Sequence, residues 1–571
     1  MAEVRGRHAR VQDADDRPEQ PEGAQGQEQP EAPEQPEAPE QPEAPEEQPS
    51  VAKSATLMGS ATLLSRVTGL IRTWAMAFAL GNTMVTSAYQ VANTLPNAIF
   101  DLVAGGLLGT AFIPVLLLQR ERYGRRKSNE FACNILSIIL VVMGALAVLA
   151  TIFSPQVIAT QTFTVGDEAQ VTGYAVLFFR IFAAQILFYG VAGVLEGILN
   201  ANREYFLPAL APVFNNICVI VSFFSYVPLS GIDETLAIVV LGVGTTLGVF
   251  VQMALQIPAL AKTGFRFRFH IDLHDPALME ALKIALPTFV YIVGTLVSYS
   301  FRNAFSLETG DNGPSTLNYA WIWYQLPYGV VAVSLSRTLF TEMSTAVARD
   351  DWEGLRELVR RGISLTLLLI IPLAGLIGAL ATPLMQLFQA GAFSAEDAAY
   401  VGSILALWVV SLPFYSVLRY LHNVFASLRK FVSFAVVSCC MVVAQCGLYA
   451  LLCTSDVGLA GVPIADFVYY AVCCVIMLVI LYRQIGSFRL GSIVGTAVRV
   501  LVATAVGIAV TYGLSCVLPV SGSGMLTAFV TIVVCGCVGL VVIFGLCALF
   551  RVPEMEAVVG LVKRLAGKVR R

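Results

Sequence analysis

Apolar runs long enough to cross a bilayer recur along almost the whole chain. About 30 Å of hydrocarbon requires roughly 20 apolar residues in a helix, and fourteen runs of the 571-residue sequence reach that length. They lie roughly at 55–80, 88–118, 131–153, 171–200, 206–228, 235–262, 284–306, 315–346, 362–388, 397–427, 431–453, 458–484, 493–518 and 523–550. Backbone polar groups inside lipid must be paired within each segment. The sequence therefore predicts an all-α polytopic membrane protein with about fourteen transmembrane helices.

The charges between these runs predict the orientation of the chain. Cytoplasmic connections carry an excess of Lys and Arg, and basic connections alternate with acidic or uncharged ones along the whole sequence. The basic connections lie at 119–130, 203, 262–274, 349–361, 429–430, 483–489 and 568–571, and the others lie at 81–87, 167–168, 233–234, 308–311, 396–397, 456 and 521–524. We expect both termini to be cytoplasmic, in a bacterial cytoplasmic (inner) membrane.

The first fifty residues differ from the rest. Met1–Ser50 holds 14 acidic side chains and four arginines, and it repeats Pro, Glu, Ala and Gln with almost no aliphatic side chain to bury. Such a composition predicts a disordered, solvated cytoplasmic tail. A docking arm for cell-wall synthesis proteins is the alternative. Without the tail, the net charge of the remaining chain is positive.

An internal repeat divides the membrane part. The segment from Phe188-Tyr189 to Tyr205 matches the segment from Phe414-Tyr415 to Phe431 at an offset of 226 positions, and Leu95-Pro96 matches Leu326-Pro327 at 231. Six spans per unit is an even number, so both copies enter the membrane in the same direction. Parallel repeats with a substrate site between them are a known transporter architecture.

The repeat predicts five regions. These are a tail at 1–50, a first lobe of six helices at 51–262, an amphipathic cytoplasmic linker at 263–283, a second lobe of six helices at 284–484, and two further helices with a basic tail at 485–571.

Two arginines in the first span are hard to explain structurally. Arg66 and Arg72 lie roughly 15 and 24 Å into that helix, counted at 1.5 Å per residue, and a guanidinium at bilayer depth costs at least ~2.5 kcal/mol. Arg302 follows Arg72 by 230 positions and falls at a similar depth in the second lobe. A planar guanidinium matches a pair of phosphate oxygens. The sequence thus predicts a cationic cavity for a diphosphate headgroup.

Other polar residues complete this candidate site. Ser65 and Asn97 are candidate headgroup contacts, and Asp101 is the candidate counter-ion, although a purely structural pair of Arg66 with Asp101 stays open. Arg180, Arg337, Arg419, Glu196 and His422 also fall inside predicted spans. Glu196 and His422 occupy equivalent repeat positions and are candidates for a cytoplasmic gate. The hinge candidates, where helical hydrogen bonding is weakest, are Gly69, Gly105, Gly106 and Pro327.

Several functions are disfavoured. The 12 cysteines show no CxxC pair and no histidines at ligand spacing, so we expect no metal site. There is no phosphate-binding loop of the Walker type, and no cofactor or nucleic-acid partner is expected. A membrane glycosyltransferase or phosphatase would need clustered carboxylates or histidines at one interface, which the short acidic loops lack. A non-transporting scaffold would make the buried arginines dispensable.

The chain resembles the MurJ/MviN family of lipid II flippases, within the MOP superfamily that also contains MATE antiporters. The resemblance rests on Ser65-Arg66-Val67-Thr68-Gly69-Leu70-Ile71-Arg72, on Leu95-Pro96-Asn97 with Gly105-Gly106 and Ala111-Phe112-Ile113-Pro114, and on Gln325-Leu326-Pro327-Tyr328-Gly329-Val330. The two first-span family arginines fall on Arg66 and Arg72. Phe100, Asp101, Gly105 and Ile322 stand where well-known members carry charged residues, a pattern that resembles the high-GC Gram-positive branch.

The resemblance implies a transporter and not an enzyme. Its substrate would be lipid II, an undecaprenyl-diphosphate lipid carrying a disaccharide-pentapeptide, moved from the inner to the outer leaflet by alternating access for peptidoglycan synthesis. Coupling to the membrane potential or to a monovalent cation is expected. A flippase for another polyprenyl-diphosphate glycan and a MATE-like cation-coupled exporter remain the alternatives, the second disfavoured because a cationic drug would need acids in the cavity.

Overall fold

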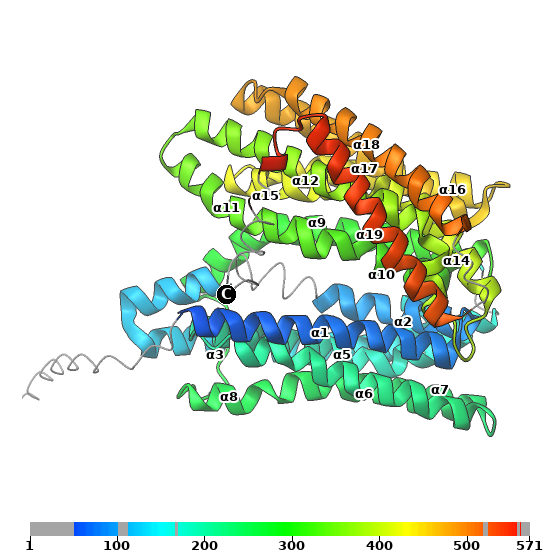
Figure 1. Cartoon of the computed structure of the whole chain (residues 1–571). Coiled ribbons are helices and arrows are strands. Elements are labelled where there is room, and N and C mark those ends of the chain that lie inside the picture. The colour runs from blue at the N-terminus through cyan, green and yellow to red at the C-terminus, as the bar shows by residue number, and fades with distance from the viewer. Residues whose placement is uncertain (1–50, 101–111, 166–168, 518–523, 557–559, 561–571) are drawn as a thin grey trace, which may run out of the picture. The chain divides into compact units, whose positions relative to one another are not determined.

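The computed structural model describes residues 51–100, 112–165, 169–517, 524–556 and 560. Helices dominate these residues, which contain no β-strand, and residues 52–571 belong to one compact unit (Figure 1). Three of the predicted site residues, Asp101, Gly105 and Gly106, lie outside the described residues, as does the predicted tail at 1–50.

The N-terminal helical group comprises helices α1 to α8. Its helices are α1 (Val51–Leu80), α2 (Met84–Phe100), α3 (Ile113–Ile152), α4 (Ser154–Thr162), α5 (Gln170–Ala201), α6 (Phe206–Ser230), α7 (Glu234–Ala254) and α8 (Gln256–Lys262). Helix α5 lies at its centre, in contact with α2, α3 and α7. Tyr89 of α2 packs edge-on against Phe178 and Phe182 of α5, which ties these helices together.

The C-terminal helical group follows. Its elements are α9 (Pro276–Glu308), α10 (Gly313–Pro327), the π-helix η2 (Tyr328–Ala332), α11 (Val333–Ala348), α12 (Trp352–Ala379), α13 (Ala381–Gln386), α14 (Ala395–Trp408), η3 (Val409–Ser411), α15 (Leu412–Ser427), α16 (Phe431–Cys453), η4 (Gly458–Ala460) and α17 (Gly461–Ile485). Helices α18 (Leu490–Val517) and α19 (Met525–Leu549) pack against each other and on α12. Glu554 accepts hydrogen bonds from Arg360 and Thr496 and so fastens the segment after α19.

Ten helices within the described residues are long and apolar enough to cross a membrane. The four other predicted spans fall on α1, on α2 with the start of α3, on α9, and on α10 through α11. The protein is therefore a multi-pass membrane protein, and the count of fourteen spans stays a prediction. The predicted connection at 119–130 is helical, because α3 continues through it with one break at Gly124, where φ is 79°.

The two halves of the repeat share backbone geometry. Arg203 and Arg429, which are 226 positions apart, both adopt a positive φ, at 63° and 56°. The residue after each one donates its N–H to the carbonyl five residues earlier, Glu204 to Leu199 and Lys430 to Phe425. This is the 6→1 hydrogen bond that ends helices in a Schellman motif. The predicted repeat is thus matched by the same helix terminus in both copies.

Hydrogen bonds join the two groups at one end of the molecule, here called the junction end, near Asn82, Ser315 and Gly391. Asn82 receives the Ser315 hydroxyl and donates to Thr316 Oγ1 over 3.0 Å. Tyr319 Oη donates to the carbonyl of Gly81 over 2.9 Å. Figure 1 shows α2, α10 and α14 meeting at this end.

A second set of polar contacts crosses nearby. Gln161, just before the end of α4, bonds Ser300 and Asn303 of α9, each over 2.8 Å, and Asn303 also donates to Thr94 of α2 over 3.2 Å. Phe163 packs on Phe301 and Phe305 beside them. Helix α4 therefore links the N-terminal group to α9.

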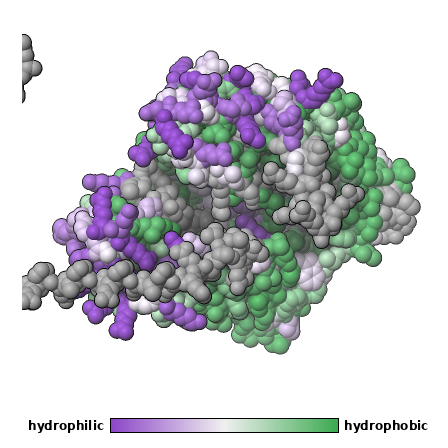
Figure 2. Space-filling view, turned by 60° about the vertical axis from the view of Figure 1, so that its left-hand side comes forward, coloured by the Kyte–Doolittle hydropathy of each residue, from purple (hydrophilic) through white to green (hydrophobic). Residues whose placement is uncertain are grey.

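The opposite end, here called the basic end, carries the connections 119–130, 262–274 and 349–361. Figure 2 views the molecule from this side and shows hydrophilic atoms gathered around a hollow. The two helical groups thus meet through their hydrogen bonds at the junction end and border a hollow that faces the basic end.

A substitution at Gly391 can test how closely the two groups pack at the junction end. Its φ is 60°, and a Cβ atom there would lie 2.2 Å from the Phe78 carbonyl oxygen, while Ala392 N–H donates to that same oxygen over 2.9 Å. We expect Gly391→Ala to separate the groups at this end, measured as longer spin-label distances between the start of α2 and the start of α14.

Gly458→Ala is the matched control. Gly458 has nearly the same φ, 58°, but its Cβ would meet nothing within 4 Å. Both variants carry the left-handed backbone cost of about 1–2 kcal/mol, so only the clash distinguishes them. Equal distances in the two variants would contradict a close-packed junction.

Candidate functional site

Helix α1 is held by its small polar residues and presents its arginines elsewhere. Asn216 of α6 donates to Thr68 Oγ1 over 3.0 Å and to the Ser65 carbonyl over 3.3 Å, and Gly69 faces the same amide. Ser65, predicted as a headgroup contact, therefore packs towards α6 through its backbone.

Arg66 and Arg72 keep their charge uncompensated. Arg66 is exposed and Arg72 is partly buried, near Tyr89 of α2. Neither forms an ion pair with any residue that the structure describes. Asn97, also a predicted contact, is exposed on α2 directly after the buried Pro96. Among the described residues, the N-terminal group thus offers two guanidinium groups that form no ion pair.

Arg302 of α9 lies among aromatic rings. Its guanidinium carbon is 4.7 Å from the centroid of Tyr299, 5.9 Å from that of Trp321 and 6.0 Å from that of Trp408. Its Nε is buried without a hydrogen-bond partner. Cation–π attraction offsets part of the cost of holding this charge at membrane depth.

A buried carboxylate behind Arg302 was missed in the sequence. Asp466 of α17 is 1% exposed, and its oxygens accept hydrogen bonds from Trp408 Nε1 over 2.8 Å, from Gln445 Nε2 over 2.7 Å and from Tyr449 Oη. Arg302 is close enough to attract this carboxylate, and Trp408 contacts both groups. A single acid in the apolar span 458–484 was the signal that could have found it.

The polar network continues back to α9. Ser298, one turn before Arg302, donates to Gln445 Oε1 over 2.9 Å, and Gln445 donates in turn to Asp466. Asp466 is thus the acid that acts on Arg302 within its own helical group, although no ion pair joins the two among the described residues.

The predicted gate residues are not brought together. His422 of α15 is enclosed by Tyr291, Phe431 and Phe434, with ring centroids 4.9–5.8 Å away, and no ion pair joins it to Glu196 among the described residues. Desolvated between aromatic rings, His422 serves the packing of α15 against α9 and α16 in this conformation.

Pro327 marks a break in the helix that contains it. The α-helix α10 ends at this residue and gives way to the π-helix η2, and a Cβ at Gly329 would meet nothing within 4 Å. Single π turns often occur at functional sites. The hinge prediction for Pro327 thus coincides with an irregular backbone, whereas Gly69 sits inside the regular helix α1.

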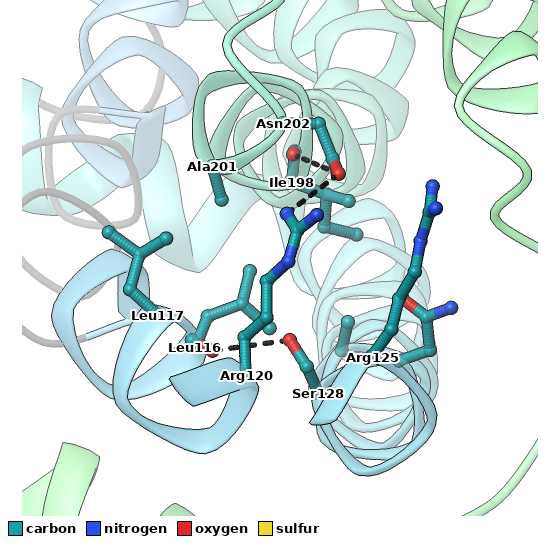
Figure 3. A pocket seen from close by; sticks show the side chains of 10 residues that line it. Leu116, Leu117, Arg120, Arg125, Ser128, Ile198, Ala201 and Asn202 are labelled. Carbon is teal, nitrogen blue, oxygen red and sulfur yellow. Dashed lines mark hydrogen bonds between the residues drawn. The ribbon is translucent and has the colours of Figure 1, made fainter. Parts of the chain in front are cut away.

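A small basic pocket lies at the basic end (Figure 3). Arg120 donates to Asn202 Oδ1 over 3.2 Å, and Arg125 donates to the Thr263 carbonyl over 2.5 Å. Figure 3 shows the Arg120 guanidinium pointing to Asn202 at the end of α5, whereas the Arg125 side chain extends away beside it. These bonds hold the α3 break against α5 and α8, so the arginines have a structural role there.

Removing the Asp466 carboxylate should destabilise the C-terminal group. Asp466→Ala removes the carboxylate that accepts from Trp408 Nε1, Tyr449 Oη and one N–H of Gln445, whose Nε2 still donates to Tyr449, and each buried donor left unsatisfied costs about 1–3 kcal/mol. We expect a clearly lower melting temperature in detergent, read from tryptophan fluorescence.

Asp456→Ala is the matched control, because Asp456 is exposed in the turn before η4. A surface change of this kind shifts stability by about 0.5 kcal/mol or less. If both alanine variants melt together with the unmodified protein, the network around Asp466 does not stabilise the fold.

Comparison with known proteins assigns the family. A family model described as lipid II flippase MurJ matches residues 76–534, which is more than half of the chain. A Rhizobium meliloti (strain 1021) protein named probable lipid II flippase MurJ is 29% identical over 356 residues, which cover 62% of this chain and 66% of the relative. The Burkholderia cenocepacia lipid II flippase MurJ is 26% identical, covering 60% and 67%. The chain thus spans about two thirds of these relatives' length.

Solved structures agree at the level of the fold. The structure titled lipid II flippase MurJ, inward closed conformation, aligns with a TM-score of 0.71 at 19% identity, covering 87% of this chain and 98% of that one. An inward-facing multidrug resistance MATE transporter of the MOP superfamily aligns with a TM-score of 0.64 at 16% identity, covering 76% and 99%. The chain belongs to the lipid II flippase MurJ family.

Proposed function

We propose that this chain is a transporter that moves lipid II from the inner to the outer leaflet of a bacterial cytoplasmic membrane. Its family membership and its relatives' names support this substrate. The observation that carries the proposal is the pair of uncompensated arginines, Arg66 and Arg72, in a helix at membrane depth. Nothing structural in the described residues neutralises them, and a diphosphate would.

The junction end is the extracytoplasmic end in this proposal. Acidic or uncharged connections among the described residues, such as 81–87 and 308–311, lie there, and the described basic connections lie at the other end, as the excess of Lys and Arg in cytoplasmic loops requires. Both termini are then cytoplasmic. The hydrogen bonds of Asn82 and Gln161 close the path to the outside, and the headgroup enters from the basic end.

The headgroup binds between the arginines while the prenyl tail stays in lipid. Helices α18 and α19 expose a strongly apolar surface, including Leu526, Phe529 and Val541, along which a hydrocarbon chain can lie. The return to the inward state follows release, and the flexible points are Gly69 and the π-helix after Pro327. The proposal also includes Gly105 and Gly106 as hinges and Asp101 as the counter-ion. These three residues lie outside the described residues.

The arginine chemistry fits other polyprenyl-diphosphate glycans as well. A guanidinium fork recognises the diphosphate and not the sugar attached to it, so a related lipid is the second candidate substrate. An organic cation would be repelled by the same residues. The proposed partners are the lipid and, through the acidic tail, cell-wall synthesis proteins.

Removing the arginine charges one at a time tests whether these residues bind the headgroup. In cells depleted of the native protein, Arg66→Ala and Arg72→Ala should abolish rescue and outer-leaflet lipid II, since each removes a charge-assisted hydrogen bond worth about 1.5–3 kcal/mol. Arg302→Ala should reduce transport as well, and loss of its partnership with Asp466 should also lower its stability.

Arg349→Ala is the control, because Arg349 is exposed just after α11 and belongs to no proposed site. Expression is checked for each variant. Normal lipid II flipping by well-expressed Arg66→Ala and Arg72→Ala proteins would refute the assignment of the cavity.

The membrane potential should drive transport. An anion that moves outward from a negative interior gains about 2.3 kcal/mol per charge per 100 mV, and the empty cationic cavity is drawn back by the same field. In proteoliposomes we expect the flipping rate to rise several-fold when a potassium diffusion potential of about 100 mV makes the basic end negative.

The same vesicles test whether transport is coupled to a monovalent cation instead. A monovalent cation as the driving species predicts a rate that follows the sodium or proton gradient at zero potential. A rate that ignores the potential and follows such a gradient would replace potential-driven transport by cation coupling.

A further inference from the structure

Two arginines of the C-terminal group share one set of tyrosines. This tyrosine–arginine cluster consists of Arg302, Tyr291 and Tyr299 of α9, Tyr328 of η2, and Tyr415 and Arg419 of α15. Arg419 Nη1 donates to Tyr291 Oη over 3.4 Å, and its guanidinium carbon lies 5.3 Å from the Tyr415 ring centroid. The Tyr299 ring centroid lies 4.7 Å from the Arg302 guanidinium carbon, and Tyr299 is also among the groups that interact electrostatically with Arg419.

Arg419 has no acidic partner. The groups that act on its charge are the tyrosines of the cluster, and no ion pair involves it among the described residues. It lies eight residues before Ser427, roughly 12 Å along α15 from the helix end at 1.5 Å per residue. Charges at such depth face a cavity or a functional partner.

The cluster is accessible, unlike the packed core behind it. Arg419, Arg302, Tyr291, Tyr299 and Tyr328 are each partly exposed. Tyr415 is buried and stacks edge-on against Tyr328 at 5.0 Å, which fixes the rings. A ligand can therefore reach the exposed parts of these residues without rearranging the core, although Arg302 Nε itself is buried.

The chemistry of the cluster differs from that of α1. The tyrosine described near Arg72 is Tyr89, which is only 4% exposed and packs against Phe178 and Phe182 of α5. Tyrosines combine a flat apolar face with a hydroxyl that both donates and accepts. A polyhydroxylated ring has apolar C–H faces and hydroxyl edges that match such a surface, and an arginine supplies donors for its oxygens.

We infer that the tyrosine–arginine cluster binds the sugar that adjoins the diphosphate, with Arg419 and Tyr299 as the selective contacts. This inference rests on the proposed function and adds the recognition of the glycan, which Arg66 and Arg72 do not provide. Arg302 lies on the diphosphate side of the cluster and Arg419 on the sugar side.

Binding to two lipids tests the inference. Purified full-length protein in detergent is titrated with lipid II and with undecaprenyl diphosphate, which lacks the sugars. The unmodified protein should prefer lipid II. Arg419→Gln and Tyr299→Leu should weaken lipid II binding about tenfold, the worth of one charge-assisted hydrogen bond, and leave undecaprenyl diphosphate binding within about twofold.

Four further variants separate the explanations. Arg66→Ala should weaken both lipids equally. Tyr400→Phe on α14 and Arg349→Gln just after α11, which are exposed and lie outside the proposed sites, should change neither. Melting temperatures identify a variant that fails to fold, and Arg419→Lys, which keeps the charge but not the planar fork, should restore folding without restoring the sugar preference.

Equal loss of both lipids in a folded Arg419→Gln variant, or no loss at all, would overturn the sugar assignment while leaving the diphosphate cavity intact. Failure of the unmodified protein to bind either lipid would instead overturn the proposed function, and the sugar assignment with it.

Discussion

A guanidinium group within a bilayer needs water, a counter-charge or an aromatic face, and the two helical groups meet this need in different ways. The C-terminal group surrounds Arg302 with three aromatic rings and sets Asp466 behind it. The N-terminal group offers Arg66 and Arg72 no partner among the described residues. Arg419 of the C-terminal group also lacks an ion pair among the described residues, but it lies against the Tyr415 ring, so the two groups hold their charges in different surroundings.

This difference between the two helical groups fits a substrate with two chemically different ends. A lipid-linked headgroup has a compact anionic end and a larger neutral glycan, and one wall is cationic and polar while the other is cationic and aromatic. The two helical groups that carry these residues are joined at the junction end by the hydrogen bonds of Asn82, Tyr319 and Gln161. Alternating access then requires these bonds to break, and they are neutral hydrogen bonds that can re-form with water at modest cost.

Much of this architecture was predictable from the sequence. Hydrophobic run length predicted the helices, and the offset of 226 positions predicted a repeat whose copies end in the same motif at Arg203 and Arg429. These features are local or periodic, so they can be recognised in a single sequence. The helical break at Gly124 was harder to predict, because the charged residues around it are compatible with both helix and loop.

Partnerships between distant residues were not predictable. Asp466 is 164 positions from Arg302 in the sequence, and nothing local indicates that Trp408 and Gln445 converge on it. The gate proposed from Glu196 and His422 assumed that equivalent repeat positions face each other, but His422 is enclosed by the rings of its own group. Repeat symmetry fixes backbone positions; side-chain surroundings depend on neighbours that have diverged between the copies.

A structure determined by electron cryomicroscopy with lipid II bound tests the central claim most directly. The account predicts diphosphate density within hydrogen-bond distance of Arg66 and Arg72, with the first sugar against Tyr299 and Arg419 and the junction end closed. Diphosphate density at any other surface, with these arginines left to solvent, would contradict it.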